Sequence, residues 1–109
     1  MVRLNFKKCY EKFINNGEKR TTVRVGDKTK RFHRGQMVDL TVGSRYKPRI
    51  LFTTHISHVE ALPFCNILDE DLKEESPDCR TVDGLWCTMF HINKVLLEPN
   101  DVVTIIHWI

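Results

Sequence analysis

The hydrophobic pattern of this chain changes its period at Gly17, and this change constrains the fold more than any other feature of the sequence. Before the glycine, apolar residues recur at the i, i+4, i+7, i+8 spacing of one helical stripe: Phe6, Tyr10, Phe13 and Ile14. This spacing predicts a helix over about residues 7–16, and the β-branched residues after the glycine predict a strand over 19–25. Because a glycine just past a helix can adopt the left-handed conformation that closes the last turn, we expect the helix to end at Gly17.

The rest of the chain alternates between strand-like and helix-like segments. Alternating or β-branched residues predict strands over 37–42, 50–59 and 102–108, the last of which is expected to close a sheet or barrel. The acidic segment 68–75 predicts a short helix. Thr81 can cap a further helix, whose core-facing stripe is expected to contain four apolar residues: Leu85, Met89, Ile92 and Leu96.

The length and composition of the chain limit its organisation. A chain of 109 residues is long enough for one hydrophobic core and too short for two, so residues 1–109 are expected to form a single domain. The apolar runs are shorter than the roughly 20 residues of a membrane helix, and the first residues do not resemble a secretory signal. We therefore expect a cytoplasmic protein whose four cysteines are free thiols: Cys9, Cys65, Cys79 and Cys87.

The cysteine and histidine spacing does not indicate a metal site. The sequence contains no Cys-x-x-Cys or His-x-x-x-His pair, and Cys87 and His91 form a single pair on one helical face. Phosphate-cradling and dinucleotide-binding glycine motifs are also absent from the sequence. No metal or other cofactor is expected.

Basic residues gather in the first half of the chain. The formal net charge is only +3, but most Lys and Arg residues lie between positions 3 and 49, while acidic residues concentrate in 69–78. Such asymmetry predicts either an anion-binding face or merely a solvated surface.

Aromatic residues lie among these cations in two short segments, 31–34 and 45–47. This mixture suits RNA, since cations bind phosphates and rings stack on bases. Phe32 could equally belong to the core, whereas the polar neighbours of Tyr46 predict that its ring is exposed.

The junction from Gly17 to Arg24 carries the clearest candidate chemistry. Strand alternation places Thr22 and Arg24 on one face, and Lys19 can fold back over that face from the turn. We therefore expect an ammonium, a hydroxyl and a guanidinium to converge in one concave pocket at the end of the sheet.

This order of elements resembles a known family. A helix, the pattern Gly-x-Lys-x-x-Thr-x-Arg, a loop ending in Arg-Gly-Gln-Met-Val at 34–38 and a strand are similar to the signature of the ASCH domain, which has a PUA-like fold. The resemblance implies an α+β fold with a small β-barrel flanked by two or three helices. Within that superfamily the chain is particularly similar to the small bacterial N4-acetylcytidine amidohydrolases.

That resemblance implies roles for individual residues. Lys19 and Thr22 match the catalytic Lys and Thr of these enzymes, and the third catalytic residue is expected to be Glu74, with its neighbour Glu75 left open. Thr22 is expected to attack the amide carbonyl carbon while Lys19 acts as base and the glutamate protonates the departing amine. Ligand binding is expected from five residues: Arg20, Arg24, Arg34, Tyr46 and Lys47.

The expected partner is RNA or a modified nucleoside. The alternative to a hydrolase is a non-catalytic module that binds RNA or a nucleotide, and the sequence leaves both open.

Overall fold

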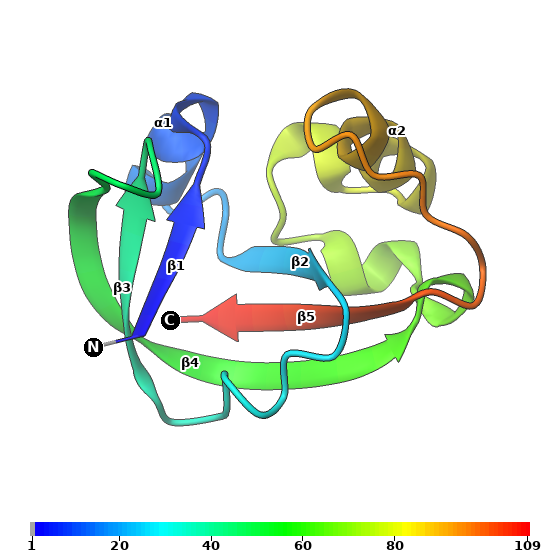
Figure 1. The fold of residues 1–109 in the computed structure, drawn as a ribbon, viewed down its shortest axis with the longest axis horizontal. Coiled ribbons are helices and arrows are strands. Elements are labelled where there is room, and N and C mark those ends of the chain that lie inside the picture. The colour runs from blue at the N-terminus through cyan, green and yellow to red at the C-terminus, as the bar shows by residue number, and fades with distance from the viewer. Residues whose placement is uncertain (1) are drawn as a thin grey trace.

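The computed structural model describes residues 2–109, which form a curled five-stranded sheet with helices at both ends (Figure 1). The strands are β1 (Val2–Phe6), β2 (Thr21–Val25), β3 (Met37–Val42), β4 (Arg49–Pro63) and β5 (Val102–Trp108). They lie in the order β1-β3-β4-β5-β2, so that β1 and β2 are the two edges. Only β1 and β3 pair in parallel. Because β4 is long enough to pair with β3 at its start and with β5 at its end, one strand carries the sheet around a half-barrel.

The first strand is the main departure from the sequence prediction. Phe6 was expected on a helical stripe, but it ends β1 and is buried with Leu4 on the same face of the strand. The helical part is shorter than expected, consisting of a 3₁₀ turn (Lys8–Tyr10) followed by α1 (Glu11–Asn15). The period of two between Leu4 and Phe6 prevails because a parallel partner, β3, is available to cover that face.

The turn into β2 follows the prediction. Gly17 has φ of +83°, the left-handed conformation that closes a helix. The predicted strands over 37–42 and 102–108 coincide with β3 and β5. The predicted strand over 50–59 is correct but too short at both ends.

The acidic segment forms 3₁₀ turns rather than an α-helix. Three such turns, Phe64–Asn66, Asp69–Leu72 and Pro77–Cys79, lead into α2 (Val82–His91). Thr81 caps α2 as expected, since its Oγ1 accepts a hydrogen bond from the Gly84 amide at 3.0 Å.

The predicted core stripe of α2 is correct only in part. Leu85 and Met89 are buried, but Leu96 lies beyond the helix and is 58% exposed. The helix ends before this position because the chain turns at Lys94, which has a left-handed φ of 58°.

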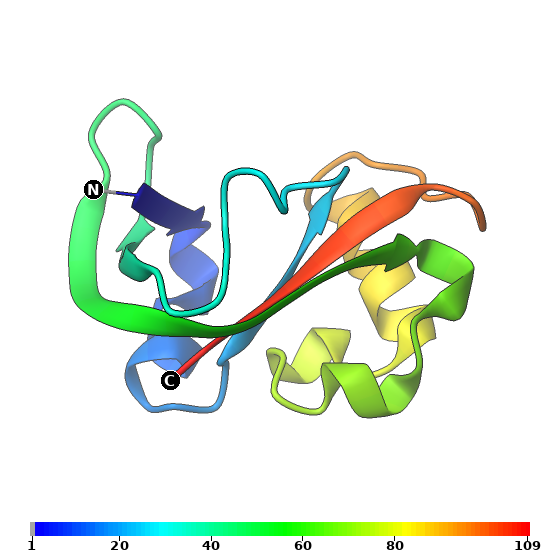
Figure 2. The ribbon, with the colours of Figure 1, turned by 90° about the horizontal axis from the view of Figure 1, so that it is seen from below.

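The hydrophobic core has two parts, one on each side of the twisted sheet. Ile106 of β5 packs with Leu4, Val38 and Trp108, whereas its neighbour Ile105 packs with residues of α2. Figure 2 shows α1 and α2 on opposite sides of the strands β2, β4 and β5. The candidate site lies between these two halves.

None of the helices in residues 2–109 is long and apolar enough to cross a membrane. All four cysteines are free thiols, of which only Cys79 is buried.

Candidate functional site

A cavity of about 460 Å³ opens between the edge strands β1 and β2 and the helix α2. One wall is polar or charged and includes Asn5, Tyr10, Lys19, Thr22, Arg24 and Glu75. The part of the lining that α2 and the loop after it contribute is largely apolar and includes Leu85, Met89 and Val95, and Val23 of β2 adds a further apolar side chain. The three side chains that the sequence predicted to converge, Lys19, Thr22 and Arg24, therefore line the same cavity.

Lys19 is held rigidly at the start of β2. Its backbone amide donates to the carbonyl of Phe13 at 2.9 Å, which fixes the turn after α1. The residue is 3% exposed, and its ammonium donates to the Glu75 carboxylate and, at 2.8 Å, to the Thr21 carbonyl. The ammonium also lies 5.5 Å from the ring centre of Phe6 and 5.3 Å from that of Tyr10. A buried charge needs such partners, because the interior cannot solvate it.

The structure places Glu75, the neighbour that the sequence left open, and not Glu74, beside Lys19. The Glu75 carboxylate also accepts a hydrogen bond from the Ser76 amide at 3.0 Å. Glu74 is exposed and lines a separate hollow beside His58 and His107. The backbone determines which of the two glutamates faces the cavity. The carbonyl of Glu74 accepts a hydrogen bond from the Arg20 amide at 2.7 Å, and the side chain of the next residue, Glu75, then points towards the cavity.

Thr22 and Arg24 lie on one face of β2, as strand alternation predicted. Arg24 Nε donates to Thr22 Oγ1 at 3.2 Å, and its Nη2 donates to the Asn5 carbonyl at 2.9 Å. The second bond connects the two edge strands, β1 and β2. Burial lowers the pKa of Arg24 to about 10, with the charge of Arg31 acting in the same direction and that of Glu75 opposing it. The guanidinium therefore remains cationic at neutral pH.

Two further ionisable groups of the cavity are held neutral. Burial, assisted by Asp78, raises the pKa of Tyr10, whose hydroxyl donates to Asp78 at 3.3 Å. Burial and then the charge of Glu75 raise the pKa of the Cys79 thiol to about 12. At neutral pH neither a phenolate nor a thiolate is available here, which leaves Lys19, Glu75 and Thr22 as the groups suited to proton transfer and nucleophilic attack.

The other predicted ligand-binding residues lie outside this cavity. Within residues 2–109, its lining includes Arg45 but not Arg20, Arg34, Tyr46 or Lys47. Arg20 is exposed and donates to the Gly17 carbonyl. Tyr46 is 80% exposed, as predicted, and its ring stacks against the Arg45 guanidinium with 5.1 Å between the guanidinium carbon and the ring centre.

Sequence reasoning missed the contributions of β1 and of Arg45. Asn5 and Phe6 reach the site only because β1 pairs with β3 at the sheet edge. The alternation of Leu4 and Phe6 was the one signal that could have indicated this strand. Phe32, left open between stacking and core, is 5% exposed and packs in the core.

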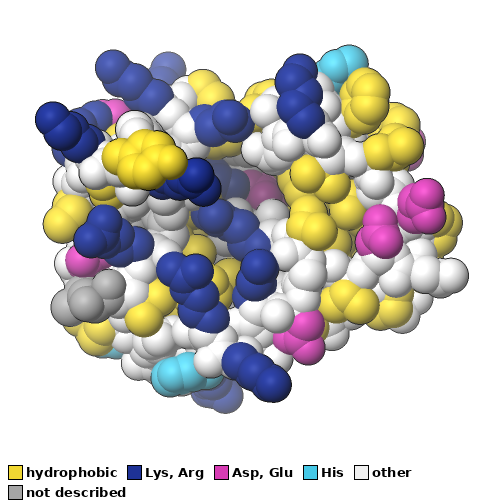
Figure 3. All heavy atoms as spheres, in the orientation of Figure 1, with side chains coloured by type: hydrophobic (Ala, Val, Ile, Leu, Met, Phe, Trp, Pro, Cys, Tyr) yellow, Lys and Arg dark blue, Asp and Glu magenta, His cyan; other side chains and the backbone are white. Residues whose placement is uncertain are grey.

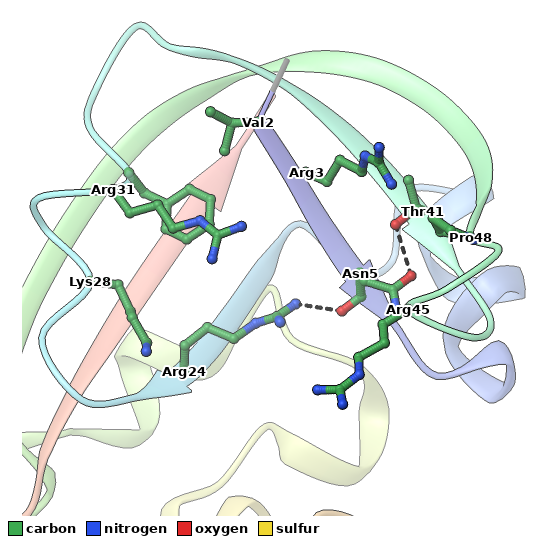
Figure 4. A pocket seen from close by; sticks show the side chains of 10 residues that line it. Val2, Arg3, Asn5, Arg24, Lys28, Arg31, Thr41, Arg45 and Pro48 are labelled. Atoms are coloured by element: carbon green, nitrogen blue, oxygen red, sulfur yellow. Dashed lines mark hydrogen bonds between the residues drawn. The ribbon is translucent and has the colours of Figure 1, made fainter.

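A second hollow of about 770 Å³ adjoins the cavity and shares Asn5, Arg24 and Arg45 with it. Its charged lining is entirely cationic and consists of Arg3, Arg24, Lys28, Arg31 and Arg45 (Figure 4). Figure 3 shows Lys and Arg side chains gathered over this half of the molecule, next to an apolar surface on the α2 half. We call this second depression the basic hollow.

Comparison with solved structures identifies the kind of fold. No family model matches the sequence, and no curated protein does. Solved structures do match: the ASCH domain from Lactobacillus crispatus JV V101 has a TM-score of 0.64 at 11% identity, covering 92% of this chain and 69% of that one. The DUF984 protein EF3133 from Enterococcus faecalis V583 gives 0.61 at 12% identity, covering 92% and 68%. The hypothetical protein PH0355 gives 0.63 at 15% identity, covering 99% and 98%.

The chain therefore has an ASCH-like, PUA-like fold: a small α+β structure with a curled half-barrel sheet and flanking helices.

Proposed function

We propose that the cavity binds an N-acylated pyrimidine nucleoside and hydrolyses its exocyclic amide. The observation that carries this proposal is the buried Lys19–Glu75 pair, which lies in the same cavity as the Thr22 hydroxyl and the Arg24 guanidinium. The cavity volume of about 460 Å³ falls within the range of small-molecule sites. N4-acetylcytidine, the substrate that the sequence resemblance implies, is the specific compound proposed.

The Lys19–Glu75 pair suits both proton transfers of such a reaction. Moving one proton along their hydrogen bond converts the ion pair into a neutral amine and a carboxylic acid, the base and the acid that the reaction needs. The amine of Lys19 can then take the proton of Thr22 as Oγ1 bonds to the amide carbonyl carbon. The carboxylic acid of Glu75 gives its proton to the departing nitrogen as the carbon–nitrogen bond breaks.

The first half of the reaction leaves an acyl ester on Thr22 and restores the Lys19–Glu75 ion pair. Water then adds to the acyl carbon, and its proton returns through the same pair to Thr22 Oγ1 as the acid leaves. Arg24 already donates to Thr22 Oγ1, so it can stabilise the negative charge that develops near this atom in both halves.

The apolar part of the cavity lining suits the uncharged part of the substrate. Leu85, Met89 and Val95 come from α2 and the loop after it and offer a surface for a pyrimidine ring or an acyl methyl group. A substrate that contacts both the apolar and the charged lining has its amide next to the reactive groups.

The test uses chromatography to measure the release of cytidine from N4-acetylcytidine. We expect wild-type turnover and a loss of about 100-fold or more in kcat for Lys19→Ala, Thr22→Ala and Glu75→Gln. Glu74→Gln is the matched control, since it makes the same chemical change one residue away and should leave the rate within about twofold of wild type.

Folding is checked by circular dichroism before rates are compared. Thr22→Ser keeps the hydroxyl and should retain more activity than Thr22→Ala. A wild-type rate no higher than that of Thr22→Ala would refute the proposed hydrolysis.

The basic hollow favours a second candidate, a non-catalytic module that binds RNA. Five cations without a carboxylate in the lining can neutralise several phosphates, and the resulting affinity should fall steeply with salt. This candidate predicts equal RNA binding by wild type and Thr22→Ala, with no cytidine release from either. Salt-insensitive binding would contradict it.

A further inference from the structure

The basic hollow has a charge that the cavity chemistry does not use. Its five cationic side chains come from four separate parts of the chain: β1, β2, the segment between β2 and β3, and the segment between β3 and β4. Within residues 2–109 the ion pairs are Lys19–Glu75, Arg49–Glu11 and His58–Glu60, so none of the five forms an ion pair with a carboxylate. Like charges placed together without acidic partners destabilise a fold, and such an arrangement is typical of an anion-binding site.

Two guanidinium groups of the hollow, those of Arg24 and Arg31, are already held in place. The Arg24 guanidinium is fixed by bonds to Asn5 and Thr22 and lies 4.8 Å from the ring centre of Phe6. The Arg31 guanidinium lies 5.3 Å from the ring centre of Phe32, which is buried. Figure 4 shows the side chains of Arg24, Lys28 and Arg31 directed into the same space. Cations already held in place lose little side-chain entropy on binding, which strengthens their interaction with phosphate oxygens.

The position of the hollow indicates how a ligand is arranged. Arg24, Arg45 and Asn5 line both the hollow and the cavity, so the two spaces are continuous. The residues that α2 and the loop after it contribute to the cavity are neutral, among them Thr88 and Asn93. The cations that line the cavity, Lys7, Lys19, Arg24 and Arg45, therefore all come from elements other than α2 and the loop after it, and two of them also line the hollow. A strand of RNA that passes through the site has phosphates on both sides of each base, whereas a mononucleotide has its phosphate on one side.

We propose that the basic hollow is a phosphate subsite and that the ligand of this protein is a nucleotide, with its base in the cavity and its 5′-phosphate in the hollow. The identity of the base rests on the proposed function above, but the phosphate subsite is a separate feature of the surface. Arg31 and Lys28 bind the phosphate, and Arg24, shared by both spaces, lies where the sugar joins them.

The experiment compares N4-acetylcytidine with its 5′-monophosphate. Wild type should have a kcat/KM about tenfold or more higher for the monophosphate at low salt, because charge-assisted hydrogen bonds to phosphate are strong and are screened by ions. The double variant Lys28→Gln/Arg31→Gln should lose this preference and should also lose binding of pyrophosphate, measured by calorimetry. The control, Lys12→Gln/Lys94→Gln, removes the same charge outside both spaces and should keep the preference.

The outcomes separate this inference from the proposed function. Pyrophosphate binding that depends on Lys28 and Arg31, without hydrolysis of either substrate, supports the subsite and refutes the hydrolase. Hydrolysis of both substrates at equal kcat/KM, without pyrophosphate binding, refutes the subsite alone. A single-stranded RNA oligomer that displaces the monophosphate more strongly than free nucleotides at equal phosphate concentration would assign the hollow to an RNA backbone and overturn the nucleotide proposal.

Discussion

Removing one partner of the buried Lys19–Glu75 pair should destabilise the protein far more than removing both. Lys19 is 3% exposed and Glu75 is 2% exposed, so neither charge can be solvated when its partner is lost. Lys19→Met keeps the length of the side chain but leaves the Glu75 carboxylate with the Ser76 amide as its remaining donor. Breaking a buried pair in this way costs about 3–5 kcal/mol, a large share of the roughly 5–15 kcal/mol that stabilises a typical domain.

The assay is urea unfolding of four proteins: wild type, Lys19→Met, Glu75→Leu and the double variant. Each single variant should lose about 3 kcal/mol or more, and the double variant should lose about 2–3 kcal/mol less than the sum of the two. Glu74→Gln is again the matched control and should change the free energy of unfolding by less than about 0.5 kcal/mol. Single variants that each cost under about 1 kcal/mol and add within error would refute the buried-pair reasoning.

Two further predictions concern stability away from this pair. Burial, with His58 acting in the same direction, lowers the pKa of His107 from its ordinary 6.5 against the opposing carboxylates of Glu74, Asp71 and Glu60. The unfolded chain therefore binds more protons at this histidine than the folded chain does. The contribution of His107 to the free energy of unfolding should be complete above pH 6.5 and should be lost as the pH falls through the folded pKa. His107→Gln should flatten the pH dependence of the free energy of unfolding measured in urea, and an unchanged pH dependence would contradict this. Gly84→Ala should lower the melting temperature, because the new Cβ would lie 2.6 Å from the Asp78 carbonyl oxygen. This clash should outweigh the higher helix propensity of alanine. A higher melting temperature would show that the turn at Asp78 moves to make room for the methyl group.

Local physical chemistry determined much of this protein. The left-handed Gly17, the Thr81 cap and the strands β3 and β5 follow from backbone preferences and from the alternation of side chains over a few residues. The common orientation of Thr22 and Arg24 follows from the same alternation. These features need no knowledge of distant parts of the chain, which is why the sequence alone could predict them.

Strand pairing and hydrogen bonds between distant segments determined the features that the sequence did not predict. Residues 2–6 become a strand only because β3 lies parallel to them, and this brings Asn5 and Phe6 into the site. The choice of Glu75 over Glu74 depends on one backbone hydrogen bond between Arg20 and Glu74, across more than fifty residues of sequence. Neighbouring glutamates look alike in a sequence, and only the folded backbone determines which of them is buried against Lys19.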